Sequence, residues 1–241
     1  MKNNPEFYIL GEPIETEIGK CEFIKVKDFP DYFQELQFMS MSKEEIAYQY
    51  SKLNKKGEID ELIQRIKSCT SIYEVVTNID ELFELSQAYM KVFLRVFEEE
   101  SISKITKENF DELRKLILTM NCQKEDKINP NPEIQRALER SRRVKQQESE
   151  NLTFSDIVTS IVGFNGLTYE NIKEMTVYQL YMTFYRIAQI KGYDTSTLFA
   201  TVATEKINIE SWSKHIEMFE EEKHTISHET FKRTTGKVVS E

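Results

Sequence analysis

The sequence predicts a mainly α-helical, bundle-like protein with a small β-hairpin or meander near its N-terminus. The 241 residues include only seven glycines and five prolines, too few for the turns that sandwiches and barrels need about every ten residues. After position 28, apolar residues recur at three- and four-residue steps, which is the period of an amphipathic helix. Fifteen Phe and eleven Tyr provide large apolar surfaces for a core, so the composition is not that of a disordered chain.

Residues 6–27 are the predicted strand region. The apolar run from Phe7 to Leu10 precedes a Gly-Glu-Pro turn, and apolar and charged residues then roughly alternate from Ile14 to Val26. Such alternation is typical of half-buried strands. Because two strands alone are marginally stable in water, we expect this hairpin to pack on a helix or on another copy of the chain.

Helices are predicted from Asp28 onward. Ser42 to Glu45 and Ser71 to Glu74 fit the capping box, in which a hydroxyl and a carboxylate satisfy free backbone amides at a helix start. Residues 79–99 show the clearest amphipathic pattern of the first half, and residues 107–121 predict a further helix.

Residues 122–151 differ from the rest and suggest a domain boundary. The Asn-Pro-Asn-Pro run at 129–132 must end a helix, because proline lacks an amide hydrogen and disfavours helical geometry in the residue before it. The residues that follow are polar on nearly all sides. We therefore interpret 122–151 as a polar linker or exposed helix between an N-terminal hairpin-plus-helix domain (1–121) and a C-terminal helical domain (152–220). A polar tail (221–241) ends the chain.

The C-terminal domain is predicted to contain several short helices. One starts at Thr153 and ends at Gly163 or Gly166, and a second starts at Thr168. A capping box at Thr176 starts a third helix, which Gly192 closes. Two more apolar segments follow: a helix capped by Asp194 to Thr197 that runs through Leu198, Phe199 and Val202, and a last amphipathic turn or two containing Trp212, His215, Ile216 and Phe219.

Charge and cysteine content exclude several classes of function. A formal net charge of −9 argues against a general nucleic-acid-binding surface, because phosphate contact needs clustered cations. Cys21, Cys69 and Cys122 are widely spaced and odd in number, so neither a disulfide framework nor a zinc site is predicted. No apolar segment is long enough for a signal peptide or a membrane span. We expect reduced thiols in the cytosol, with no nucleic-acid or membrane partner.

No group of residues predicts catalysis, a cofactor or a metal site. His224 and His228 have a spacing that metal sites use, with His215 and Glu220 to Glu222 as the nearest further ligands, but they lie in the polar tail and are better explained as exposed. Neither a Gly-rich phosphate loop nor a GxSxG turn occurs. A nucleophilic Cys69 or Cys122 is disfavoured because all three histidines fall in the last thirty residues. We expect that the protein is not an enzyme.

Charged runs have ordinary explanations. Glu98 to Glu100 and Glu220 to Glu222 are predicted to be solvated helix ends. The basic run Arg136, Arg140, Arg142, Arg143 and Lys145 could meet an acidic partner or nucleic acid, but a solvated linker is the preferred interpretation.

An aromatic cluster gives the best indication of a binding surface. Tyr178, Tyr181, Tyr185 and Tyr193 recur with Phe184 at helical spacing. Most of them are expected in the core, but some must lie off the buried stripe, and tyrosine is favoured at protein interfaces. The four tyrosines and Trp212 are our predicted partner-binding residues.

Five segments resemble the tail assembly chaperones, also called tail morphogenetic proteins, of large contractile-tailed bacteriophages of Gram-positive hosts. The likeness covers about residues 80 to 237 and is strongest after 129. The segments are Asn129 to Gln135, Phe154 to Val162, Met175 to Tyr181, Tyr193 to Val202 and Ile209 to Ile216.

The resemblance implies a protein that binds the tape-measure protein and keeps it soluble during tail-tube assembly. Its partners would be the tape-measure protein, with the tail-tube protein and a second copy of this chain as further candidates. It would work in the cytoplasm of the infected bacterium and be absent from the mature virion. The alternative is a structural component of the tail, neck or baseplate, and an enzyme is the third and least favoured hypothesis.

Overall fold

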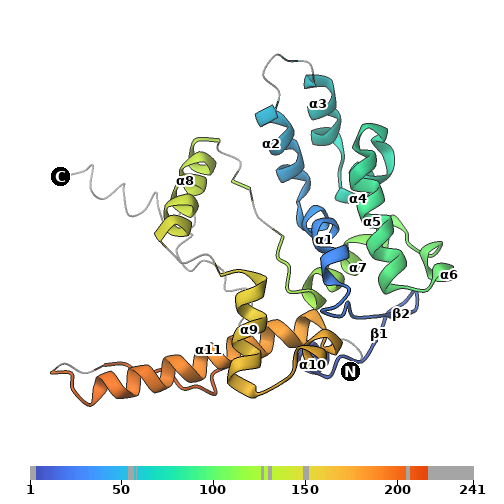
Figure 1. Ribbon diagram of the computed structural model, residues 1–241. Helices are drawn as coiled ribbons and strands as arrows, with labels where there is room; N and C mark the ends of the chain where they lie inside the picture. The colour runs from blue at the N-terminus through green and yellow to red at the C-terminus, as the bar shows by residue number, and fades with distance from the viewer. Residues whose placement is uncertain are drawn as a thin grey trace, which may run out of the picture.

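A computed structural model describes residues 4–53, 57, 59–125, 128–129, 132–148, 152–204 and 207–216, with side chains given only for 133–141 within 132–148 (Figure 1). The described chain is mainly α-helical with one small antiparallel hairpin, so the predicted fold class is confirmed.

The hairpin consists of β1 (Ile14–Glu15) and β2 (Lys20–Cys21), with Ile14 opposite Cys21. It packs on helices, as expected for so small a sheet: the Cys21 thiol is buried 3.6 Å from the Met120 sulfur. The prediction that the strand region includes residues 6–10 is wrong, because residues Pro5–Leu10 form a 3₁₀ helix, η1. Proline at its first position and an Asn4 side chain that accepts from the Glu6 amide favour the helical start.

Short helices make up the rest of the N-terminal half, and the helix predicted over 79–99 is divided among η3, α5 and α6. Phe97, between α5 and α6, has an extended backbone that interrupts the helix. The helix predicted over 107–121 is confirmed as α7. The elements are η2 (Phe29–Asp31), α1 (Phe33–Ser40), α2 (Lys43–Leu53), α3 (Asp60–Ser68), α4 (Ile72–Asn78), η3 (Asp80–Leu82), α5 (Phe83–Val96), α6 (Glu99–Ile102) and α7 (Lys107–Met120).

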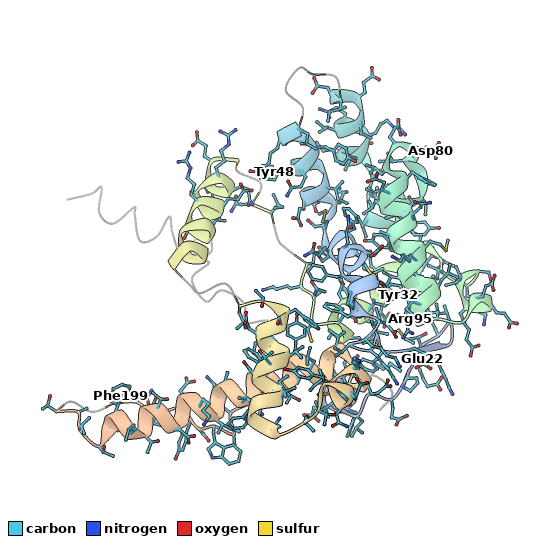
Figure 2. The ribbon with its side chains drawn as sticks, in the orientation of Figure 1. Glu22, Tyr32, Tyr48, Asp80, Arg95 and Phe199 are labelled. Carbon is cyan, nitrogen blue, oxygen red and sulfur yellow. The ribbon has the colours of Figure 1, made fainter. Side chains whose placement is uncertain are left out.

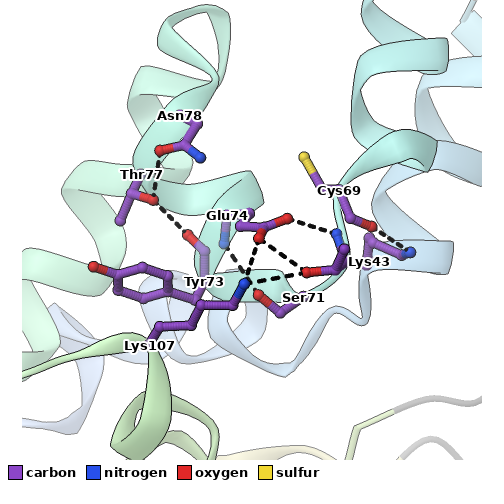
Figure 3. A network of polar contacts seen from close by, with 9 residues as sticks. Lys43, Cys69, Ser71, Tyr73, Glu74, Thr77, Asn78 and Lys107 are labelled. Carbon is purple, nitrogen blue, oxygen red and sulfur yellow. Dashed lines mark hydrogen bonds and ion pairs between the residues drawn. The ribbon is translucent and has the colours of Figure 1, made fainter.

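The start of α4 shows how the predicted capping residues act (Figure 3). The Ser71 hydroxyl accepts from the Glu74 amide at 3.4 Å, as a capping box requires. The Glu74 carboxylate, however, accepts from the Thr70 amide at 2.6 Å and from Lys107 of α7 at 2.6 Å. Hydrogen bonds from Lys107 and Thr70 lower the pKa of Glu74 to about 2. The cap therefore also ties α4 to α7.

The main core lies where α1 and α7 pack against α5. Tyr89 of α5 is fully buried, and its ring stacks on Phe110 of α7 with centroids 5.4 Å apart. Phe93 meets Phe110 edge-on at 5.7 Å. Aromatic side chains with large buried areas thus supply much of the stabilisation of the N-terminal half.

Four helices follow: α8 (Pro132–Glu148), α9 (Phe154–Asn165), α10 (Tyr169–Glu174) and α11 (Val177–Ala200). Within the segment 122–151 the structure has helix α8, which stands apart from α9 to α11 (Figure 1). A 2.8 Å ion pair joins its Glu139 to Lys52 of α2. Of the two predicted ends for α9, the structure shows Gly166, with φ +67°.

The prediction that Gly192 closes a helix and that Asp194 starts another is wrong. Helix α11 runs through both residues to Ala200. A glycine inside a helix costs only about 1 kcal/mol relative to alanine. Gly192 does not have a positive φ, so nothing in its backbone geometry ends the helix.

Residues 24–27 connect the two halves of the chain. The Val26 amide donates to the Met175 carbonyl at 2.9 Å, and the Val177 amide donates to the Ile24 carbonyl at 3.0 Å. Lys25 and Lys27 both pair with Glu174, at 2.7 and 2.8 Å. The first turn of α11 is therefore fixed to the N-terminal half, and the direction of the rest of α11 follows from it.

Candidate protein-binding surface on helix α11

Helix α11 begins with a complete capping box. The Thr176 hydroxyl accepts from the Gln179 amide at 3.1 Å, and the Gln179 side-chain oxygen accepts from the Thr176 amide at 2.8 Å. The Gln179 side-chain NH₂ also donates to the Ile9 carbonyl of η1 at 2.9 Å. Local sequence thus starts the helix, and the same residues attach it to the N-terminus.

Tyr178 belongs to the core. It is 7% exposed, its ring lies edge-on to Tyr8 at 5.6 Å and to Phe23 at 6.4 Å, and its hydroxyl donates to the Pro5 carbonyl at 3.4 Å. Tyr178, one of the predicted partner-binding residues, is therefore covered by the chain's own residues.

Tyr181 and Tyr185 form a transition from core to surface. Their ring centroids are 6.4 Å apart, and Phe184 meets Tyr185 edge-on at 6.0 Å. Tyr181 packs against both hydrophobic cores of the chain, whereas Tyr185 is exposed. Partial burial raises the pKa of both phenols.

The distal half of α11 contributes no buried side chain among the described residues. Helix α9 covers α11 through Ile157 and Ile161, which pack with Leu180 and Ile187 in a second core. The C-terminal part of α11 continues past α9, away from the other helices (Figure 1). At about 1.5 Å per residue, its last thirteen residues extend roughly 20 Å beyond that core.

This projecting end carries exposed apolar side chains. Leu198 is 69% exposed, Phe199 59% and Val202 78%, and Figure 2 shows Phe199 near the far end of α11. Leu198 and Phe199 lie in the last turn of α11, and Val202 lies in the turn directly after its end at Ala200. Tyr193 is also exposed. Asp194 is the single charged residue between Gly192 and Thr204, so the end of α11 is nearly uncharged.

The segment 207–216 returns along α11. Arg186 of α11 donates to the Trp212 carbonyl at 2.7 Å and to the Lys214 carbonyl at 3.0 Å. Within the predicted amphipathic segment the described residues form one turn at 212–213, and Phe219 lies outside the described residues. The Trp212 side chain is half-exposed and His215 is exposed. We call the exposed apolar residues of this region the α11 surface: Tyr185, Tyr193, Leu198, Phe199, Val202 and Trp212.

The sequence identified only part of this surface. Leu198, Phe199 and Val202 were recognised as a helical apolar stripe, but nothing in the local pattern said whether another element covers them. No local sequence pattern could identify Arg186 as a contact residue, because the carbonyls that it binds lie 26 and 28 residues further along the chain.

The cysteines, charged runs and possible metal ligands considered in the sequence gain no support as functional sites from the described structure. Burial raises the pKa of the Cys21 and Cys122 thiols, which disfavours a thiolate nucleophile. Glu98 to Glu100 are exposed, as are Arg136 and Arg140. Within the described ranges, no three His, Cys, Asp or Glu residues are placed to hold a metal ion. His224, His228, Glu220 to Glu222 and the predicted polar tail lie outside the described residues.

No helix in the described part of the chain combines the length and apolar character needed to cross a bilayer.

Comparison with known proteins places the chain in a family. Residues 2–130 match the YomV N-terminal domain, and residues 145–217 match the YomV second domain. The chain is 43% identical over 228 residues, 94% of each protein, to the SPbeta prophage-derived uncharacterized protein YomV of Bacillus subtilis (strain 168). No solved structure matches it.

Proposed function

The chain belongs to the YomV family, and from this premise we propose that it is a phage tail assembly chaperone. It binds the tape-measure protein and keeps that protein soluble while the tail tube is assembled. Two observations support this role: a relative that is prophage-derived by its name, and segments resembling tail assembly chaperones. Four of these segments, from Phe154 to Ile216, lie within the match to the second domain. We propose that it acts by binding alone, without catalysis, in the cytoplasm of the infected bacterium.

The observation that carries this proposal is the distal half of α11. Leu198 and Phe199 are exposed on a part of α11 that has no fully buried side chain beyond Ile187 among the described residues, and Val202 is exposed in the turn that follows the helix. Burying a Val, Leu or Phe side chain stabilises a complex by about 1.5–3 kcal/mol. A nearly uncharged apolar end is suited to cover an apolar segment of another polypeptide, since it adds no charge that must be desolvated.

The size of the surface fits temporary binding. Three such side chains contribute about 5–9 kcal/mol in total, whereas association costs about 4–15 kcal/mol in lost freedom of motion. Binding of one copy of the chain through these three side chains alone is therefore weak. Many copies along one long tape-measure chain would still protect it from aggregation through avidity, and tube subunits can displace each copy in turn.

Co-expression with the tape-measure protein encoded nearby tests the proposal. Leu198→Gln and Phe199→Gln remove apolar surface while introducing a residue that favours helix at least as well. We expect the wild-type chain to bring the tape-measure protein into the soluble fraction, and each variant to bind it at least tenfold more weakly. Leu94→Gln, which changes an exposed leucine of α5, is the matched control. Equal soluble yields with all four chains would refute the role of the α11 surface.

Mass spectrometry of purified particles separates the chaperone from a structural component of the tail, neck or baseplate. A chaperone is released before assembly ends, so we expect no stoichiometric signal from this chain in mature virions. Stoichiometric presence would reject the chaperone role in favour of the structural one.

A further inference from the structure

A second apolar surface lies far from α11 in the sequence, in a groove of about 540 Å³ between α2 and the η3–α5 junction. This volume is within the range of about 300–1,000 Å³ typical of ligand sites. Ile46 and Leu85 form part of its buried floor, while Leu53 and Phe83 are 72% and 63% exposed. We call this site the α2–α5 groove. Its apolar floor and exposed apolar edges leave large side chains without cover in the free chain.

The charged side chains that line the groove are both glutamates. Among the described residues that line it, the charged ones are Glu81 and Glu84. Glu81 pairs with Arg65 of α3. The exposed Glu84 carboxylate lies near Tyr50 of α2, whose phenol pKa is raised first by burial and then by the charge of Glu84. The groove therefore combines an apolar floor with the exposed carboxylate of Glu84 at its edge.

We propose that the α2–α5 groove binds an amphipathic helix of a partner protein, with leucine-like side chains on the floor and a lysine or arginine beside Glu84. Amphipathic helices bind grooves of this kind through apolar residues spaced three or four apart. Charge complementarity selects a basic helix and disfavours an anionic lipid surface. It also disfavours a symmetric pairing of two copies through this groove, because each copy would present the same glutamates to the other.

This inference goes beyond the proposed function, because different elements form the groove and it requires no tail protein as its ligand. A synthetic probe can therefore test it. The probe is a fluorescein-labelled 18-residue peptide of leucine and lysine with a helical apolar stripe, titrated with the full chain and followed by fluorescence anisotropy. A peptide with the same composition in strict alternation, and a leucine–glutamate peptide with the helical stripe, are the matched control probes.

We expect saturable binding of the leucine–lysine helix and little binding of either control peptide. Leu53→Gln and Phe83→Gln should each weaken binding at least tenfold, since each removes a large apolar contact. Glu84→Gln should weaken it up to about fivefold, the range of an exposed ion pair. Leu94→Gln and Glu99→Gln change an exposed leucine and an exposed glutamate outside the groove. Chains with either substitution should bind the leucine–lysine peptide as tightly as the wild type.

Equal losses of peptide affinity in the groove variants and in their matched controls would overturn the proposal. They would show that the basic peptide is attracted to the acidic protein in general and not to the groove. A shift in molar mass by light scattering on Phe83→Gln would also overturn it, by assigning the groove to contacts between copies. Leu198→Gln should leave peptide binding unchanged. The groove and the α11 surface can therefore fail independently.

Discussion

Replacing Arg114 with methionine should lower the free energy of unfolding by about 3 kcal/mol. Arg114 lies on α7 and is 2% exposed. Its Nε donates to the Met39 carbonyl at 2.8 Å and to the Tyr89 hydroxyl at 2.9 Å, and its Nη2 donates to the Met41 carbonyl at 3.0 Å. It also pairs with Glu125. One side chain thus holds the junction of α1 and α2, which lines the α2–α5 groove, against α5 and α7.

The estimated loss of stability follows from the interaction that each partner of Arg114 loses. Breaking a buried ion pair costs about 3–5 kcal/mol when it leaves an uncompensated charge. Glu125 has a side chain that is 39% exposed, so water can solvate its carboxylate and the lower end applies. The Tyr89 hydroxyl still donates to the Met39 carbonyl at 3.2 Å, but the Met41 carbonyl loses its Arg114 donor at a cost of about 1–3 kcal/mol. Methionine retains the helix propensity and most of the aliphatic volume.

Urea denaturation followed by circular dichroism measures the effect. With a slope of about 3 kcal/mol per molar urea, the midpoint should fall by about 1 M. Arg65→Met is the matched control, because Arg65 makes a solvent-exposed pair with Glu81 from another helix and should cost less than about 1 kcal/mol. Equal midpoints for the two variants would refute the reasoning that burial makes the Arg114 network important.

Two further predictions concern the attachment and the continuity of α11. Hydrogen bonds from Lys25 and Lys27 lower the pKa of Glu174 to about 2, so its contribution to stability is complete above its ordinary pKa of 4.5 and is lost as the pH falls towards 2. Glu174→Gln should therefore lower the melting temperature at pH 7 but leave it unchanged near pH 2; a pH-independent difference would contradict this. Gly192→Ala should raise the unfolding free energy by about 0.5–1 kcal/mol, because the helix is continuous there and nothing lies within 4 Å of the added methyl group. Gly166→Ala, at φ +67°, should instead destabilise the protein in the same thermal melts, and a destabilising Gly192→Ala would indicate a helix break at that position.

Features encoded by nearby residues could be predicted well. The scarcity of glycine and proline predicted helices, and the caps at Thr153, Thr168 and Thr176 marked helix starts that the structure confirms. These signals succeed because a cap or a helical stripe depends on residues three or four positions apart. The same local rules failed at Gly192, where a residue of low helix propensity lies in a helix that continues past it.

Burial and exposure needed the folded chain. Tyr178 and Tyr185 have the same side chain and lie on the same helix, yet Tyr178 is in the core because Tyr8 and Phe23, more than 150 residues earlier, reach it. The Arg186 contacts with the return segment and the walls of the α2–α5 groove likewise join residues far apart in sequence. By itself the sequence determined the mainly helical class and the capped helix starts. Only the tertiary structure decided which apolar stripes stay uncovered, because coverage depends on distant elements whose positions are set by the summed packing of the whole chain.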